Sequence, residues 1–193
     1  PRLALLRAEM EADRLDGFLV PRADVHQGEY VAAHDERLAW LTGFTGSAGF
    51  CAALMGAAGV FIDGRYRTQV KAQVALEFTP VPWPEVSLGD WLKGQLPDGG
   101  RIGFDPWLHS AGQIADLERE LEGSGISMVQ DDNLVDRIWE DQPAPPMNPV
   151  KLHPIEFAGE SAIDKCQRLA KDLRAAGQQS AVITLPDSIM WLL

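Results

Sequence analysis

The sequence predicts an α/β fold, in which a mixed β-sheet is flanked by helices, followed by the start of a second, similar domain. Apolar residues at helical spacing alternate with short apolar runs bounded by glycine, a pattern typical of helices and strands in an α/β sheet. Two of these runs flank Gly56 and Gly59, which indicates a hairpin and therefore a mixed sheet rather than a purely parallel one. A cluster of prolines after Trp139 then divides the chain.

The first domain is assigned to residues 1–139. Leu3, Leu6 and Met10 have helical spacing, and an apolar run follows Gly17, so the chain is expected to open with a helix and a strand at 18–20. The other elements expected in this domain are, in order, a hairpin of strands at 50–55 and 60–62, a helix after Gly64, a helix around 91–96, a strand at 101–104, a helix over 110–121 begun by Ser110, and a strand at 126–129.

Residues 140–157 are assigned to a proline-rich connector. Five prolines lie between Trp139 and Phe157, and they favour an extended, stiff chain because they cannot donate backbone hydrogen bonds. Residues 158–193 are assigned to the truncated beginning of a second domain. Ser161 and Asp164 have the spacing of a capping box, which indicates that a helix begins there.

A weak internal repeat favours this second domain. Residues 2–8 are similar to residues 168–175, and each copy is followed by an expected strand, at 18–20 and 181–183, and then by an apolar stretch with a tryptophan. Chance similarity between two helix–strand units is the alternative. A single such unit cannot bury its apolar faces, so we expect the chain to be an N-terminal piece of a longer protein.

Charge and composition exclude several classes of partner. The 193 residues carry a formal net charge of −11, and residues 1–135 hold 20 acidic against 11 basic side chains. This acidic domain repels phosphate groups, so neither nucleic acid nor an anionic membrane surface is an expected partner. No apolar stretch reaches the length of a membrane span, and no signal peptide is recognised. Cys51 and Cys166 are expected to be reduced, which favours a cytoplasmic location.

Three evenly spaced glycines, Gly43, Gly46 and Gly49, precede the first hairpin strand. The segment has the spacing of neither a dinucleotide-binding loop nor a P-loop. Ser47 is not the nucleophile of a G-x-S-x-G motif, because Thr45 stands at the first glycine position. The residues alone therefore predict a tight structural turn that enters a strand.

The loop after the first predicted strand gathers groups that could bind a metal ion. His26 lies near Asp24 and Glu29, and His34 is adjacent to Asp35, although no histidine pair has the spacing of a helical zinc site. One interpretation is a carboxylate and imidazole cluster that holds a metal. The other is that these residues hydrogen-bond the loop into place.

Two further polar features have structural interpretations. Asp63 is expected to cap the helix that follows it, with Arg65 as its partner across the turn. Arg37 is expected, from the residues alone, to be a solvated arginine at a helix start. The tryptophans are interpreted as core residues: Trp40, Trp83, Trp91 and Trp107.

The chain resembles the N-terminal region of the cytosolic three-domain Xaa-Pro aminopeptidases (aminopeptidase P), whose first domain is of the creatinase/prolidase N-terminal type. The resemblance is carried in order by residues 24–30, 35–49, 61–66, 90–91, 103–105, 133–139, 157–161 and 185–193, and so extends over nearly the whole chain. It implies that Arg37 lies near the mouth of a substrate cleft, where its guanidinium could grip a peptide carbonyl or carboxylate, and that His26 is a second candidate for substrate binding.

The resemblance also implies what the longer protein does. It would release the N-terminal residue from peptides with proline in second place, using two divalent metal ions, usually manganese, in a C-terminal catalytic domain. That domain is expected to lie outside this chain, which would therefore hold no catalytic residue, no metal ligand and no cofactor. The chain's own role would be to wall the substrate cleft and to support assembly, with a homodimer as one expected form.

Alternatives remain at this stage. The chain could come from another protein with the same catalytic fold, such as a prolidase or a creatinase-like hydrolase, or from a non-catalytic relative that binds peptides or histones. A free-standing interaction module is a further alternative. The metal ligands after residue 193 would separate the enzymes from the non-catalytic relatives.

Overall fold

The computed structural model describes all 193 residues and divides them into two compact units, Pro1–Pro145 and Pro146–Leu193. Each unit is described by itself. None of the helices combines the length and apolar composition needed to cross a membrane.

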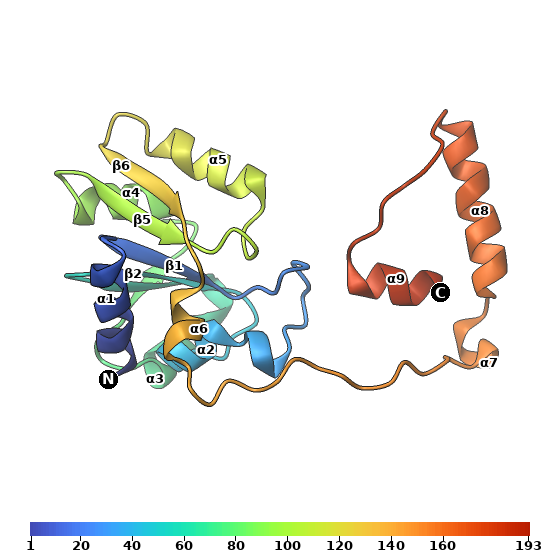
Figure 1. Cartoon of the computed structure of the whole chain (residues 1–193), viewed down its shortest axis with the longest axis horizontal. Helices are drawn as coiled ribbons and strands as arrows, with labels where there is room; N and C mark the ends of the chain where they lie inside the picture. The colour runs from blue at the N-terminus through green and yellow to red at the C-terminus, as the bar shows by residue number, and fades with distance from the viewer. The chain divides into compact units, whose positions relative to one another are not determined.

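The first unit is built around one six-stranded sheet (Figure 1). The strand order is β4-β3-β2-β1-β5-β6. The pairs β1–β2 and β2–β3 are antiparallel and the other three are parallel, so the prediction of a mixed sheet is confirmed. The strands are β1 (Gly17–Pro21), β2 (Phe50–Leu54), β3 (Ala58–Ile62), β4 (Thr79–Pro82), β5 (Gly100–Phe104) and β6 (Ile126–Gln130).

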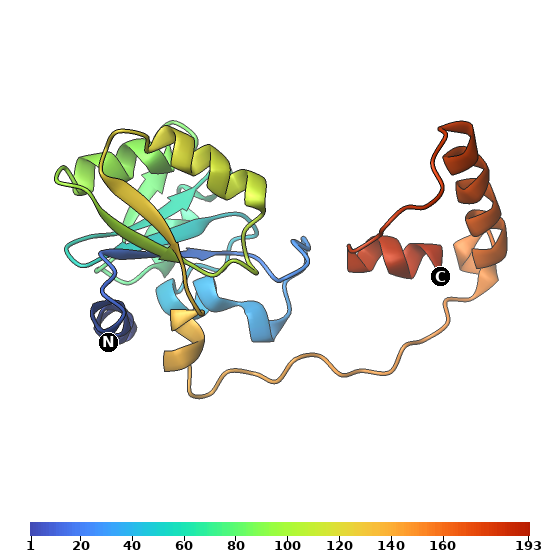
Figure 2. The same ribbon diagram turned by 45° about the horizontal axis from the view of Figure 1, so that its top comes forward.

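Helices cover both faces of this sheet (Figures 1 and 2). One face carries α4 (Leu88–Gln95) and α5 (Ala111–Glu120), which pack on the core cluster that contains Phe61. The opposite face carries four helices on the cluster that contains Phe18. These four are α1 (Arg2–Ala12), α2 (Arg37–Thr42), α3 (Gln69–Gln73) and α6 (Leu134–Ile138).

Strand alternation explains why both faces are apolar. In β1, Phe18 and Val20 point into one cluster while Leu19 points into the other, because successive side chains of a strand face opposite sides. The same alternation holds in β3, where Val60 and Ile62 lie opposite Phe61. The central strands are therefore apolar throughout and require helices on both sides.

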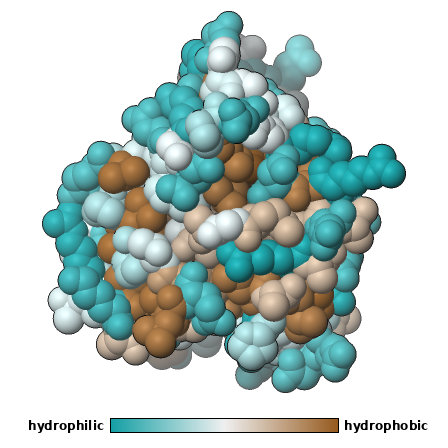
Figure 3. Space-filling view, turned by 90° about the vertical axis from the view of Figure 1, so that its left-hand side faces the viewer, coloured by the Kyte–Doolittle hydropathy of each residue, from teal (hydrophilic) through white to brown (hydrophobic).

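The surface of the first unit is mixed. On the face that bears α1, hydrophobic residues form several groups among hydrophilic ones (Figure 3). The large apolar side chains that are exposed in this unit are Leu5, Val25, Tyr30, Met55, Leu76, Trp83 and Trp107. The exposure of Trp83 and Trp107 corrects the expectation that they are core residues, since a side chain in a loop at the sheet edge has few neighbours to cover it.

Most predicted elements of the first unit are confirmed. One predicted helix is corrected, and two further elements are present that were not predicted. The helix expected after Gly64 is divided into a short 3-10 turn, Gly64–Tyr66, and α3. The sequence analysis missed β4, which contains Pro80 and Pro82 and lies at the sheet edge, where missing backbone donors are tolerated. It also missed α6, whose five residues are too few to show a helical period.

The glycine-rich segment forms the predicted turn between α2 and β2. Gly43 ends α2 with φ at +85°, in the left-handed region that glycine adopts readily. A Cβ atom at Gly43 would lie 2.6 Å from the backbone oxygen of Gln73, so the α3 backbone also requires glycine here.

We expect Gly43→Ala to lower the free energy of unfolding by about 1–3 kcal/mol, through left-handed strain and the clash with Gln73. Gly56→Ala is the control, because a Cβ atom there meets no other atom within 4 Å. Urea unfolding of both variants checks the prediction. Equal stability of the two would show that the α3 backbone yields without cost.

The second unit consists of α7 (Ile155–Ala158), α8 (Ala162–Ala175) and α9 (Pro186–Leu192). Ser161 caps α8 by accepting the amide of Asp164, so the predicted helix start is confirmed. The strand expected at 181–183 is wrong: these residues have no regular structure, because a strand needs a paired neighbour. A second correction is that α7 begins inside the segment assigned to an extended connector, residues 140–157.

Candidate functional site

The loops of the first unit gather at one edge of the sheet. Strand pairing places the ends of β1, β3, β4 and β5 at the same edge as the start of β2, because Pro21 lies opposite Phe50, and Phe50 opposite Phe61. The segments 22–32, 43–49, 63–68, 83–87 and 105–110 therefore meet there. Binding residues collect on loops held by a rigid sheet, so this edge is the candidate site.

The loop after β1, which carries His26, is held by hydrogen bonds to its backbone. Asp24 Oδ1 accepts the amides of His26 and Gly28, both at 2.9 Å. Arg22 Nη1 donates to the carbonyl oxygens of Glu29 (2.9 Å) and Ser47 (3.1 Å). The side chain of His26 is exposed and takes no part in these bonds, so the loop is ordered without using its imidazole.

No three His, Cys, Asp or Glu side chains of the chain lie together in a way that could hold a metal ion. Asp24, His26 and Glu29 therefore do not form the cluster considered from the sequence. The carboxylate of Asp24 instead orders its own loop. The metal centre considered from the sequence therefore does not fit these residues.

Arg37 lies at the centre of a buried ionic network. Its Nε and Nη2 atoms donate to the two carboxylate oxygens of Asp136, at 2.6 and 2.9 Å, and its Nη1 atom donates to Asp35 Oδ1 at 2.9 Å. Arg37 is only 5% exposed. Burial opposes its charge, but the hydrogen bonds and charges of Asp136 and Asp35 outweigh burial, so the pKa of the guanidinium is raised. The expectation of a solvated arginine is wrong.

This network extends to the beginning of the connector. Gln142 Nε2 donates to Asp136 Oδ1 (2.9 Å) and to the carbonyl oxygen of His34 (3.0 Å). His34 Nδ1 lies 2.6 Å from the carbonyl oxygen of Pro143, so this nitrogen is the donor. The network therefore ties α2 to α6 and to residues 142–143. Arg37 and His26 share no hydrogen bond or ion pair.

A second polar group surrounds the 3-10 turn after β3. Asp63 accepts the amide of Arg65, which confirms the predicted cap, and also pairs with the Arg65 guanidinium at 2.6 Å. These hydrogen bonds lower the pKa of Asp63. The hydroxyls of Ser47 and Tyr66 lie 2.6 Å apart, and this bond lowers the pKa of Tyr66. Ser47 thus joins the glycine-rich turn to the 3-10 turn after β3.

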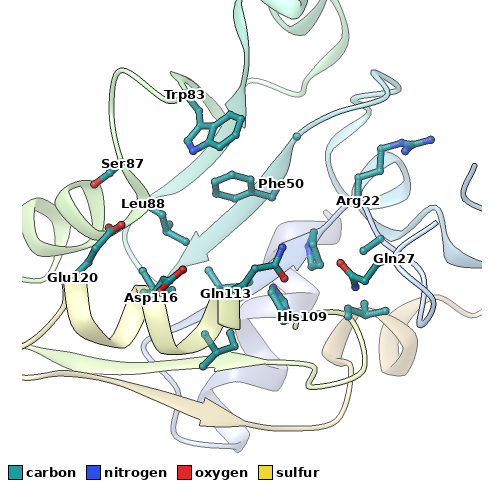
Figure 4. Close-up of a pocket in the computed structure, with 17 residues that line it drawn as sticks. Arg22, Gln27, Phe50, Trp83, Ser87, Leu88, His109, Gln113, Asp116 and Glu120 are labelled. Atoms are coloured by element: carbon teal, nitrogen blue, oxygen red, sulfur yellow. The ribbon is translucent and has the colours of Figure 1, made fainter. Parts of the chain in front are cut away.

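A pocket of about 480 Å³, which the sequence analysis missed, lies on the sheet face covered by α4 and α5 (Figure 4). Phe50, Trp83 and Leu88 line one side, and α5 lines the other. His109 lies at one end. The lining comes from β1, β2, α4, α5 and four loops, so no single stretch of sequence could have indicated it.

His109 is neutral in this position. Its Nδ1 atom lies 3.1 Å from the carbonyl oxygen of Asp105, so this nitrogen carries the proton. Burial lowers the pKa of the imidazole, and its interaction with Asp105 only partly opposes this. The unfolded chain therefore binds a proton at His109 at a higher pH than the folded chain does.

The free energy of unfolding should therefore decrease as the pH falls below about 6.5, the pKa of His109 in the unfolded chain. Protonation of His109 then favours the unfolded chain. We expect the Tm of the wild-type chain to fall more between pH 7.5 and 5.5 than that of His109→Gln. Calorimetry at the two pH values checks this. An equal fall in both proteins would mean that burial does not hold the folded imidazole neutral.

The sheet, its helices and its gathered loops define an α/β domain whose loops meet at one edge of the sheet. Residues 2–138 match the creatinase/prolidase N-terminal domain family. Residues 141–193 match a second family that has the same description. The chain belongs to the creatinase/prolidase N-terminal domain family.

Its relatives include peptidases. The chain is 39% identical to a probable Xaa-Pro aminopeptidase P of Coccidioides posadasii (strain C735), over 99% of this chain and 30% of that protein. The crystal structure of X-prolyl aminopeptidase from Caenorhabditis elegans, a cytosolic enzyme with a di-nuclear active site, matches with a TM-score of 0.87 at 31% identity, over 99% of this chain and 33% of that one.

A third match covers less of the chain. The N-terminal domain of the cytoplasmic peptidase PepQ from Mycobacterium tuberculosis matches with a TM-score of 0.54 at 26% identity, over 71% of this chain and 97% of that domain. By contrast, this chain spans about a third of the length of the two aminopeptidases.

Proposed function

We propose that this chain is the N-terminal, non-catalytic region of an Xaa-Pro aminopeptidase, an enzyme that releases the N-terminal residue from peptides with proline in second place. The observation that carries the proposal is the extent of the likeness. The two aminopeptidases match 99% of the chain, including the second unit, whereas the PepQ domain matches 71%. This difference favours a protein with a second N-terminal domain, as in the two aminopeptidases, over one with a single N-terminal domain.

The finer parts of the proposal concern the longer protein. We propose that two divalent metal ions, manganese in the expected case, are held by residues outside this chain. The di-nuclear active site of the Caenorhabditis elegans relative supports this. A cytoplasmic location is supported by the cytosolic relative. Homodimer formation remains a prediction, and so does the non-catalytic, histone-binding alternative.

We further propose that the loop edge of the first unit walls the substrate cleft. The exposed imidazole of His26 is free to meet a peptide, whereas Arg37 has three N–H groups engaged by carboxylates. Substrate binding by either residue stays a prediction. In the longer protein, His26→Ala should lower kcat/KM for Xaa-Pro peptides without changing the Tm. Unchanged kinetics would remove His26 from the cleft.

The experiment that tests the proposed function compares the 193-residue chain with the longer protein, each with and without Mn²⁺. We expect metal-dependent release of the N-terminal residue from Xaa-Pro peptides by the longer protein and none by the chain. Release by the chain itself would contradict the assignment of catalysis to residues outside it. A longer protein that binds no metal would instead favour the non-catalytic alternative.

A further inference from the structure

The pocket between α5 and β2 has an aromatic wall and an acidic wall. Phe50 and Trp83 lie edge to face at 6.3 Å, and Trp83 is 43% exposed although it is a large apolar side chain. Across the pocket, Asp116 and Glu120 lie one turn apart along α5 (Figure 4). The two walls are held by different elements and face a common space.

The carboxylates of the acidic wall are available to a ligand. Glu120 has no hydrogen-bond or ion-pair partner in the chain, and its Oε2 atom lies against Gly89 of α4, where an added Cβ would be only 2.5 Å away. Asp116 pairs with Arg119 at 2.9 Å, but both side chains are 70% exposed, and such pairs contribute little and exchange readily.

No basic group of the chain neutralises the acidic wall from within the pocket. Arg22 is the only basic side chain besides His109 in the lining. Its guanidinium is bonded to the carbonyl oxygens of Glu29 and Ser47, and it points away from Phe50 and Trp83 (Figure 4). Burial lowers the pKa of His109 and so disfavours its charged form, as described above. The pocket is therefore aromatic and negatively charged.

We propose that this pocket binds an arginine side chain on a peptide segment of a partner protein. A guanidinium is planar, so it stacks on the exposed ring of Trp83, and its N–H groups donate hydrogen bonds to Asp116 and Glu120. The volume of about 480 Å³ lies in the range of small-ligand sites. The net charge of −11 raises the local concentration of a basic segment.

Other occupants fit less well. A neutral apolar group would cover the aromatic wall but would leave the carboxylate of Glu120 without a partner, which costs free energy. A lysine ammonium is a point charge, so it lacks the flat face that stacks on Trp83 and the paired N–H groups that match a carboxylate. This inference goes beyond the proposed function and does not depend on it.

The test uses the full 193-residue chain and the peptide Ac-Gly-Arg-Gly-NH₂, with the citrulline peptide as a neutral analogue of equal shape. Binding is followed by NMR at the indole N–H of Trp83. We expect a saturable shift with the arginine peptide and none with the citrulline peptide. The paired change Asp116→Asn with Glu120→Gln should weaken binding about tenfold, because charge-assisted hydrogen bonds are lost.

The matched control is Glu118→Gln with Glu122→Gln, which removes the same two charges from exposed positions outside this pocket. It should leave binding unchanged. Equal binding of the arginine and citrulline peptides would overturn the proposal, as would equal weakening by the control pair, because general charge attraction would then suffice. The arginine peptide could also shift the Trp83 signal in the 193-residue chain but not in the longer protein. That result would overturn the pocket as a site for a separate partner.

Discussion

Arg37→Ala is expected to lower the free energy of unfolding of the chain by about 2–4 kcal/mol. Removing one partner of a buried ion pair leaves the other charge uncompensated, and this costs more than the pair contributes. Asp136 and Asp35 would both lose their cation, and Gln142 alone would remain beside Asp136. Urea unfolding measures the change.

Arg65→Ala is the matched control for this prediction. Arg65 also pairs with a neighbouring carboxylate, Asp63, but its side chain is 67% exposed. We expect it to cost much less than Arg37→Ala, because exposed ion pairs contribute little to stability. A double-mutant cycle that combines Arg37→Ala with Asp136→Ala isolates the interaction energy between Arg37 and Asp136. A loss at Arg37 no greater than that at Arg65 would show that the network contributes nothing to the fold.

The second large effect is expected at Trp139, the residue that ends α6. Trp139 is 8% exposed, and its ring is stacked on that of Trp40 in α2 at 5.2 Å with 19° between planes. Truncating a buried tryptophan leaves a cavity that its neighbours fill only in part. Trp139→Ala should therefore lower the free energy of unfolding by about 3–5 kcal/mol.

Trp107→Ala provides the control, since Trp107 is 73% exposed in the loop after β5. Its effect should lie within about 0.5 kcal/mol of zero. The comparison tests whether α6, which the sequence analysis missed, is an integral part of the first unit. If Trp139→Ala unfolds at the same urea concentration as Trp107→Ala, then α6 is a dispensable addition to the sheet.

The sequence predicted the elements whose signals are local. Leu3, Leu6 and Met10 repeat at helical spacing, and they form the buried side of α1. The hairpin of β2 and β3 was indicated by two apolar runs and the glycines between them. Ser110 was recognised as a helix start, and it forms a capping box with Gln113. In each of these cases a few neighbouring residues determine the conformation.

The features that were missed depend on distant residues. Asp136 lies 99 positions after Arg37, so nothing near Arg37 indicates that its guanidinium is buried and paired. The strand β4 exists because β3 offers it a parallel neighbour, although its two prolines argue against a strand. The opposite error occurs at residues 181–183. Their local β-propensity predicts a strand, but no neighbouring strand pairs with them.

The same distinction applies to the candidate site. The sequence indicated the loop around His26 because polar residues follow a strand there, and the structure shows this loop ordered by Asp24. It did not indicate the pocket, whose walls are separated by more than sixty residues between Phe50 and Asp116. Only the tertiary fold, which places α5 and the start of β2 around one pocket, brings these side chains together.

The measurement that tests the proposed function most directly is the substrate preference of the longer protein in the presence of Mn²⁺. We expect it to release the N-terminal residue from Xaa-Pro-Yaa tripeptides and to leave Xaa-Ala-Yaa tripeptides intact. Cleavage restricted to Xaa-Pro dipeptides would contradict an aminopeptidase and favour a prolidase. Equal cleavage of the proline and alanine tripeptides would contradict a specificity for the bond before proline.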